Sequence, residues 1–156
     1  MKKLTSILVC LTLILCLVGC GGEVDPPVDE NTDAISIRVD SESVKIGDEV
    51  TVYIEVNEVK GVKSIGLRPS FDAESFTLVD GRMLVGDVLK DFSNGIGTAI
   101  NSEAKDYTGV RVFEFVLKAK AAGTKKINCT VSFLGDADRV IEVNQPTAAS
   151  VTVSAP

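Results

Sequence analysis

The chain has 156 residues, 45% of them hydrophobic and 24% charged, with a formal net charge of −6. This composition is that of an ordinary globular protein, and the length argues against two folded domains. There is no histidine, which removes the commonest general base and metal ligand, and no motif places serine, cysteine or lysine beside an activating group. The sequence therefore predicts a protein that is not an enzyme, and it assigns no catalytic residue and no cofactor.

The first residues have the layout of an export signal. Lys2 and Lys3 precede an almost continuous apolar run, Leu4 to Val18, which is too short to cross a bilayer of about 30 Å comfortably as a helix. The run ends in Leu17-Val18-Gly19-Cys20, which resembles a bacterial lipobox. The resemblance implies that residues 1–19 are a lipoprotein signal peptide. It also implies that Cys20 is acylated and anchors the exported protein to the membrane at the bacterial cell surface. The alternative is an ordinary signal peptide with an incidental cysteine.

Residues 20–33 are expected to form an extended tether. They contain two glycines, two prolines, five acidic residues and no basic residue, a composition that cannot bury apolar surface. Loss of Lys2 and Lys3 with the signal peptide changes the net charge from −6 to −8. This excess of acidic residues argues against nucleic acid as a partner, because phosphate binding needs clustered lysine and arginine.

Residues 34–156 have a hydrophobic period of two, which indicates β-strands. Alternating apolar positions recur in five runs: Ile35 to Val39, Val50 to Val56, Phe113 to Leu117, Ile127 to Phe133, and Ala149 to Val153. Turn signals separate the runs at residues 46–48, 60–61, 80–81, 93–95 and 122–124. No long amphipathic helix competes with this pattern. We therefore expect an all-β, antiparallel β-sandwich as the only folded domain.

Three stretches of this domain, in order, resemble the cohesin family, the modules that receive dockerin domains. The stretches are Ser43 to Val52, with its Gly47-Asp48 turn; Val59 to Leu78, with Gly61, Ile65 and Phe71-Asp72; and Phe113 to Ile127, followed by the acidic loop 135–138. The resemblance implies a jelly-roll sandwich of about nine strands. It also implies that a dockerin-bearing protein is the partner.

In cohesins the dockerin lies against an exposed sheet face that includes the strand after the Gly-Ile turn. Carried onto this chain, the resemblance makes the outward positions of that strand the partner-binding residues: Ser64, Gly66, Arg68 and Ser70. Pro69 departs from a regular strand and is expected at an edge or a bulge. No binding residue is assigned between Asp87 and Tyr107, a stretch shorter and more polar than the corresponding family strands.

Other candidate sites have simpler interpretations. Cys129 shares the alternating pattern of Ile127, Val131 and Phe133, so we expect a buried, unreactive thiol beside core phenylalanines. The acidic stretches 72–74 and 136–138 have too few ligands for calcium and are expected to be solvated turns, so no metal site is predicted.

The leading hypothesis is a non-catalytic, lipid-anchored, cohesin-like receptor for a dockerin-bearing protein, of which a polysaccharide-degrading enzyme is one example. Two alternatives stay open: a carbohydrate-binding lipoprotein, and a structural domain of the cell envelope that has kept the fold without dockerin recognition. The carbohydrate alternative is weakened by the absence of tryptophan and by the presence of only two tyrosines, Tyr53 and Tyr107, because sugar-binding surfaces present aromatic rings.

Overall fold

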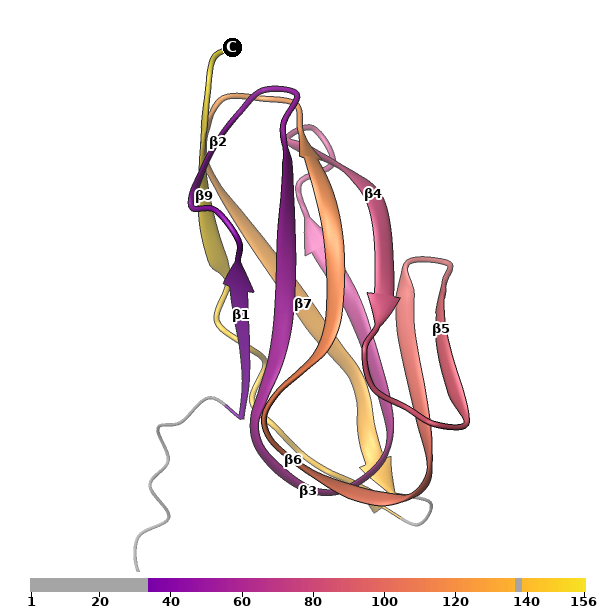
Figure 1. Cartoon of the computed structure of the whole chain (residues 1–156). Helices are drawn as coiled ribbons and strands as arrows, with labels where there is room; N and C mark the ends of the chain where they lie inside the picture. Colours follow the sequence, from indigo (N-terminus) through magenta and orange to yellow (C-terminus); the bar gives the residue numbers. More distant parts are fainter. Residues whose placement is uncertain (1–33, 137–138) are drawn as a thin grey trace, which may run out of the picture. The chain divides into compact units, whose positions relative to one another are not determined.

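The computed structural model describes residues 34–136 and 139–156, which belong to one compact unit, Thr32–Pro156. The predicted signal peptide, Cys20 and the tether lie outside the described residues. All the described secondary structure is β-strand (Figure 1). The nine strands are β1 (Ile35–Val39), β2 (Ser43–Lys45), β3 (Glu49–Phe71), β4 (Phe76–Met83), β5 (Leu89–Ser93), β6 (Ile96–Ala119), β7 (Gly123–Asp136), β8 (Arg139–Val140) and β9 (Ala149–Ser154). Within this part of the chain, no helix is long and apolar enough to cross a membrane.

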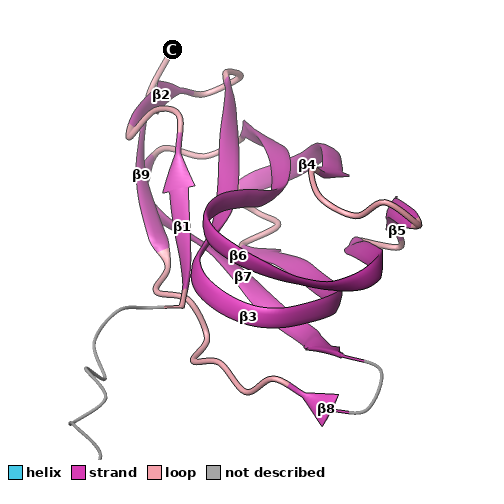
Figure 2. Ribbon diagram, turned by 60° about the horizontal axis from the view of Figure 1, so that its bottom comes forward, coloured by secondary structure: helices cyan, strands magenta, loops and turns pink. Residues whose placement is uncertain are grey.

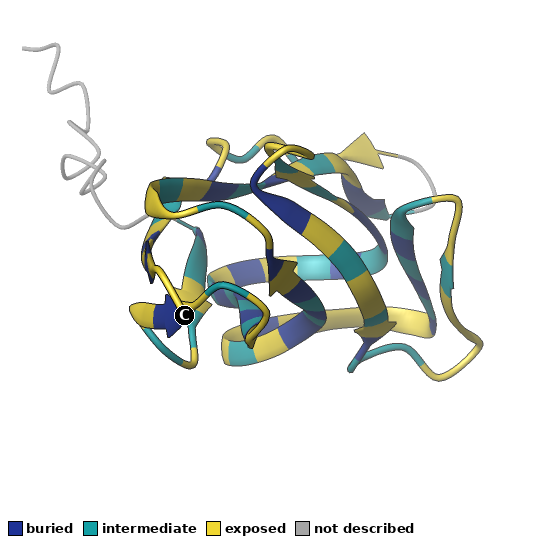
Figure 3. Ribbon diagram, turned by 90° about the horizontal axis from the view of Figure 1, so that it is seen from above, coloured by how far each residue is buried: buried dark blue, intermediate teal, exposed yellow. Residues whose placement is uncertain are grey.

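The strands form because apolar side chains alternate along them. In the first half of β3, Val50, Val52, Ile54 and Val56 are fully buried, while the residues between them are only half-buried. Figure 3 shows the same alternation of buried and accessible positions along the other long strands. The period-two prediction is thus confirmed by the structure.

Hydrogen bonding connects the strands in the order β2-β9-β7-β3-β6-β4, with β1 also paired to β3, β5 to β6 and β8 to β7. All these pairs are antiparallel except β2 with β9, which is parallel. The expected antiparallel sandwich is therefore confirmed, with one parallel pair that the sequence did not predict.

Two long strands, β3 and β6, contribute to both layers of the sandwich. Their first and second halves pair with different neighbours: residues 52–56 of β3 pair with β1, and residues 64–71 pair with β7. Figure 2 shows both strands curving from one layer into the other. The bend coincides with register shifts between Val59, Val62 and Ser64, and Gly61 adopts a φ of 71° there.

Two of the predicted turns are instead irregularities inside strands. β3 continues through Lys60-Gly61, and β4 continues through Asp80-Gly81 with a register shift between Leu78 and Asp80. Gly61 accommodates the bend of β3 through its positive φ, whereas the irregularity of β4 lies at Val79, before Gly81. In both strands the pairing with β6 resumes instead of ending. By contrast, the predicted turn at 93–95 is confirmed: Asn94 and Gly95, with φ of 52° and 70°, join β5 to β6 in a hairpin.

The core lies between the layers. Phe113, Phe115 and Leu117 of β6 are fully buried, and the Phe113 and Phe115 rings lie 5.6 Å apart. Ile127 and Cys129 of β7 are also fully buried. The prediction of a buried cysteine is confirmed. Burial raises the pKa of the Cys129 thiol to about 12, so the thiolate is scarce at neutral pH, which supports the expectation of an unreactive thiol.

Candidate functional site: the outer face of β5, β6, β3 and β7

The candidate site is the solvent-facing side of the layer in which β3 lies between β6 and β7. The register places Ser64 beside Ile100 and Gly135, Gly66 beside Thr98 and Phe133, and Arg68 beside Thr130. Directly paired residues in adjacent strands project to the same side of a sheet. The four residues assigned from the sequence, Ser64, Gly66, Arg68 and Ser70, therefore share one side of β3.

Only two of these four residues are open to a partner. Arg68 and Ser70 are exposed, whereas Ser64 is half-buried, with its hydroxyl 3.5 Å from the carbonyl oxygen of Gly135. Gly66 is buried, because a Cβ atom on it would lie only 2.2 Å from the ring of Phe133. The expectation that Gly66 forms open surface is wrong, because Phe133 covers it.

Phe133 is the principal residue that the sequence placed wrongly. It was expected in the core with Cys129, yet its side chain is 40% exposed. The register explains the difference: Leu67 pairs with Val131 but Gly66 pairs with Phe133, so Ser132 is an extra residue in β7. This bulge reverses the side to which the following residues project, which turns Phe133 outward and Leu134 into the core.

Pro69 fits its position because β3 has lost one neighbour there. The pairing of β3 with β6 ends at Leu67, while the pairing with β7 continues to Phe71. Past Leu67, one side of β3 therefore has no ladder partner among the described residues, and a residue without an N–H group is tolerated. The strand thus keeps its register through Pro69, and Arg68 and Ser70 project outward as the sequence predicted.

The segment from Asp87 to Tyr107, to which no binding residue was assigned, completes the face. It forms β5 and the start of β6, and its outward residues include Leu89, which pairs with Ile100, and Asp91, which pairs with Thr98. Leu89 is 39% exposed and Ile100 is half-buried. The face therefore combines apolar side chains, an arginine and small polar residues.

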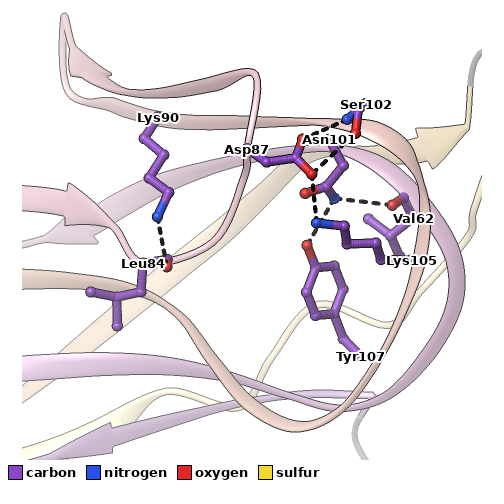
Figure 4. Close-up of polar contacts among 8 residues, drawn as sticks. All are labelled: Val62, Leu84, Asp87, Lys90, Asn101, Ser102, Lys105 and Tyr107. Carbon is purple, nitrogen blue, oxygen red and sulfur yellow. Dashed lines mark hydrogen bonds and ion pairs between the residues drawn. The ribbon is translucent and has the colours of Figure 1, made fainter.

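A polar network fixes the edge of this face. Asp87 accepts hydrogen bonds from the Ser102 amide at 2.6 Å and from the Lys105 ammonium at 2.7 Å (Figure 4). These hydrogen bonds lower the pKa of Asp87 to about 2, and the bond from Lys105 has the largest effect. Beside them, the buried Asn101 amide donates to the Val62 carbonyl oxygen at 3.2 Å and to the Tyr107 hydroxyl at 2.8 Å. The network ties the loop before β5 to the bend of β6.

Arg68 is available for an external partner. Within the described part of the chain, no carboxylate lies at ion-pair distance from it, whereas Arg38 and Arg82 on the opposite layer pair with Glu55 and Glu114. Arg111, also on the opposite layer, lies 4.3 Å from the centre of the Tyr53 ring. Arg68 shares its face with the exposed Phe133 side chain, and arginine is enriched among the residues that dominate binding energy in protein interfaces.

The acidic turn at Asp72 has a local structural role. Its carboxylate accepts hydrogen bonds from the Glu74 amide at 3.0 Å and from the Ser75 hydroxyl at 2.5 Å. Both oxygens thus stabilise the turn into β4. Among the described residues, no group of three or more potential metal-binding side chains comes together.

The sequence matches no protein-family model, and no curated protein matches it significantly. The structure, however, is similar to solved cohesin modules. A cohesin module of a family 33 glycoside hydrolase from Clostridium perfringens superposes with a TM-score of 0.60 at 15% identity, covering 80% of this chain and 100% of that one. The cohesin CaCohA2 from Clostridium acetobutylicum gives 0.57 at 18% identity, covering 78% of this chain and 92% of that one.

A third neighbour was solved with a partner. The OlpA cohesin from Clostridium thermocellum, in complex with a dockerin, has a TM-score of 0.56 at 16% identity and covers 78% of this chain and 99% of that one. At these identities the similarity establishes the fold. The described domain has the cohesin fold, as the resemblance in the sequence predicted.

Proposed function

We propose that this protein is a non-catalytic binding module of the bacterial cell surface that holds a dockerin-bearing protein against the outer face of β5, β6, β3 and β7. The cohesin fold supports this function, since several of the similar structures are complexes of cohesins with dockerins. The observation that carries it is the presence on one face of exposed Phe133 and of exposed Arg68, which has no ion-pair partner among the described residues.

The chemistry of the face suits a protein partner. The Phe133 ring and Leu89 offer apolar contact area, while Arg68 offers five donors for a carboxylate or for carbonyl oxygens. Ser70 and Thr130 supply short polar side chains around them. A central aromatic residue with a polar surround is the usual arrangement of an interface hot spot.

The test is binding of residues 32–156, the compact unit, to a panel of dockerin modules encoded by the same genome, measured by calorimetry. Phe133→Ala and Arg68→Ala should each weaken binding by about 1–3 kcal/mol, roughly tenfold to a hundredfold. Arg111→Ala is the matched control, because Arg111 lies on the opposite layer against Tyr53. Equal losses from Arg68→Ala and Arg111→Ala would place the interface elsewhere, and binding to none of the dockerins would exclude the proposed partner.

The anchoring part of the proposal rests on the sequence Leu17-Val18-Gly19-Cys20. We expect Cys20 to carry acyl chains, each of which stabilises membrane association by about 0.8 kcal/mol per buried methylene. Mass spectrometry of the membrane-extracted protein should find an acylated N-terminal cysteine, and Cys20→Ala should release the protein from the membrane fraction. A Cys20→Ala protein that stays membrane-bound would contradict the anchor.

The carbohydrate-binding alternative has less support. One face of the Tyr53 ring is occupied by Arg111, and Tyr107 is buried with its hydroxyl bonded to Asn101. Tyr107 therefore offers no ring for stacking on a sugar, and Tyr53 has at most one face left for it. The test is electrophoresis of the 32–156 unit, without any protein partner, in gels that contain polysaccharide. Slower migration in these gels would favour carbohydrate binding and a role in polysaccharide degradation without a dockerin.

A further inference from the structure

The last two strands follow one edge of β7 with a gap between them. β8 pairs with β7 at Gly135 and Asp136, and β9 pairs with it from Gly123 to Ile127; both pairings are antiparallel. The intervening residues 141–148 form no strand, and Figure 2 shows them as a loop that joins β8 to β9. The Ile141 amide still donates to the Leu134 carbonyl oxygen at 2.7 Å. From Asn128 to Phe133, the edge of β7 that faces this loop lacks a strand partner among the described residues.

Side-chain amides take the place of that missing strand. The Gln145 Oε1 atom accepts a hydrogen bond from the Val131 amide at 2.9 Å, and its Nε2 atom donates to the Val131 carbonyl oxygen at 3.4 Å. The Asn128 side chain similarly accepts from the Cys129 amide at 2.8 Å. A primary amide offers the same donor and acceptor as a peptide group. Gln145 thus occupies the position of a strand residue, and because it is exposed, its displacement costs little.

A cleft of about 530 Å³ lies beside this edge. It is lined by Val131 to Leu134 of β7, by Val140 to Gln145, and by Ala34. Phe133 and Val140, which are 40% and 74% exposed, supply apolar surface. Glu142 is the single charged residue among those that line the cleft.

We propose that this cleft binds an extended peptide segment of a protein partner, which adds as a strand to the edge of β7. The peptide replaces Gln145 at the N–H and C=O groups of Val131, as in other cases of strand addition. It places an apolar side chain against Phe133 and Val140 and a basic side chain near Glu142. The hydrogen bonds of the site use the edge of β7, whereas the Phe133 ring belongs both to this cleft and to the outer face, so a bound peptide and a bound dockerin would contact the same ring.

Charge selects the occupant. Glu142 favours a lysine or arginine in the bound segment and disfavours a carboxylate. The chain's own residues 21–33 contain five acidic residues and no basic residue, which makes them a poor match for this cleft. A basic, apolar segment of another protein is the better match.

The experiment uses isotope-labelled residues 32–156, which contain the entire core. The probe is a pool of acetylated pentapeptides with lysine at the centre and valine, isoleucine or threonine elsewhere. We expect amide resonances of Cys129 and Val131 to shift, and exchange of the Val131 amide hydrogen to slow by about tenfold or more on saturation. Gln145→Ala should bind the pool several-fold more tightly, because the competing side chain is gone, and Glu142→Gln should bind it several-fold more weakly.

Matched peptides separate strand addition from nonspecific contact. Peptides with the same side chains but with alternate backbone nitrogens methylated should lose binding, since they cannot donate to β7. Equal binding of the methylated pool, or no shift at Val131 at millimolar peptide in both the wild type and Gln145→Ala, overturns the proposal. Dimerisation of the Gln145→Ala variant through β7 would also overturn the proposal, because a second copy of the chain would then occupy the cleft. A shift at Val131 on addition of synthetic residues 21–33 would assign the cleft to the chain itself.

Discussion

At the scale of single residues, the outer face depends on the contact between Gly66 and Phe133. The ring lies where a side chain at position 66 would project, so any other residue there must displace it. Gly66 thus permits Phe133 to lie flat across β3. A glycine normally destabilises the strand that contains it. A cross-strand aromatic ring packed over the glycine offsets part of that destabilisation.

Gly66→Ala should therefore weaken partner binding without unfolding the domain. The new methyl group overlaps a ring that is 40% exposed and can swing outward, so we expect the free energy of unfolding to change by no more than about 1–2 kcal/mol. Binding should fall nearly as far as in Phe133→Ala.

A double-mutant cycle provides the check. In a Phe133→Ala background the overlap is gone, so adding Gly66→Ala should have little further effect on stability or binding. Calorimetry and thermal denaturation of the four proteins measure both quantities. Additive losses in the cycle would show that the two residues act independently, contrary to the contact seen here.

At the scale of elements, β5 is positioned through the loop that precedes it. Asp87 holds this loop to Ser102 and Lys105 of β6, and the Asp87 and Val88 amides both donate to the Ile100 carbonyl oxygen. Because the pKa of Asp87 falls to about 2 from an ordinary 3.8, its contribution to stability is complete above about pH 4. It is lost as the pH falls toward 2.

Lys105→Met should raise the titration midpoint of Asp87 toward its ordinary value, because the ammonium is the main cause of the low pKa. Carbon-detected NMR of the Asp87 carboxyl group measures this midpoint. Lys90→Met is the matched control, since the Lys90 ammonium donates to the Leu84 carbonyl oxygen (Figure 4). The same increase in both variants would mean that overall charge, rather than the Asp87–Lys105 contact, lowers the pKa.

At the scale of the whole molecule, the layers are expected to unfold together. β3 and β6 each run through both layers, so neither layer can lose its strands without disrupting the other. Val52 and Ile65, in the two halves of β3, are both buried. Their amide hydrogens should exchange through the same global opening, with free energies that agree within about 1 kcal/mol.

Phe115→Ala provides a sharper test of this cooperativity. The fully buried ring lies in the second half of β6, and its loss should lower the opening free energies of both Val52 and Ile65 by about 3–5 kcal/mol. Thr77→Ala, at an exposed position of β4, should leave both nearly unchanged. A decrease confined to Val52 would show that the layers open separately.

Much of this architecture could be predicted from the sequence, because it follows from local patterns. The period-two runs indicated the strands, Asn94-Gly95 indicated the hairpin, and the apolar neighbours of Cys129 indicated its burial. The resemblance of three ordered stretches to cohesins predicted the sandwich. The same resemblance implied that Arg68 and Ser70 project outward, and both are exposed in the structure.

Only the tertiary structure shows the features that depend on the register between strands far apart in sequence. One extra residue at Ser132 reverses the side of Phe133, and a sequence pattern does not reveal a bulge whose cause is the pairing of β7 with β3. The same is true of the bends that carry β3 through Gly61 and of the gap in which Gln145 replaces a strand. Alternation along one strand indicates which of its residues share a face. Only the pairing of strands that are far apart in sequence determines which residues of different strands contact one another.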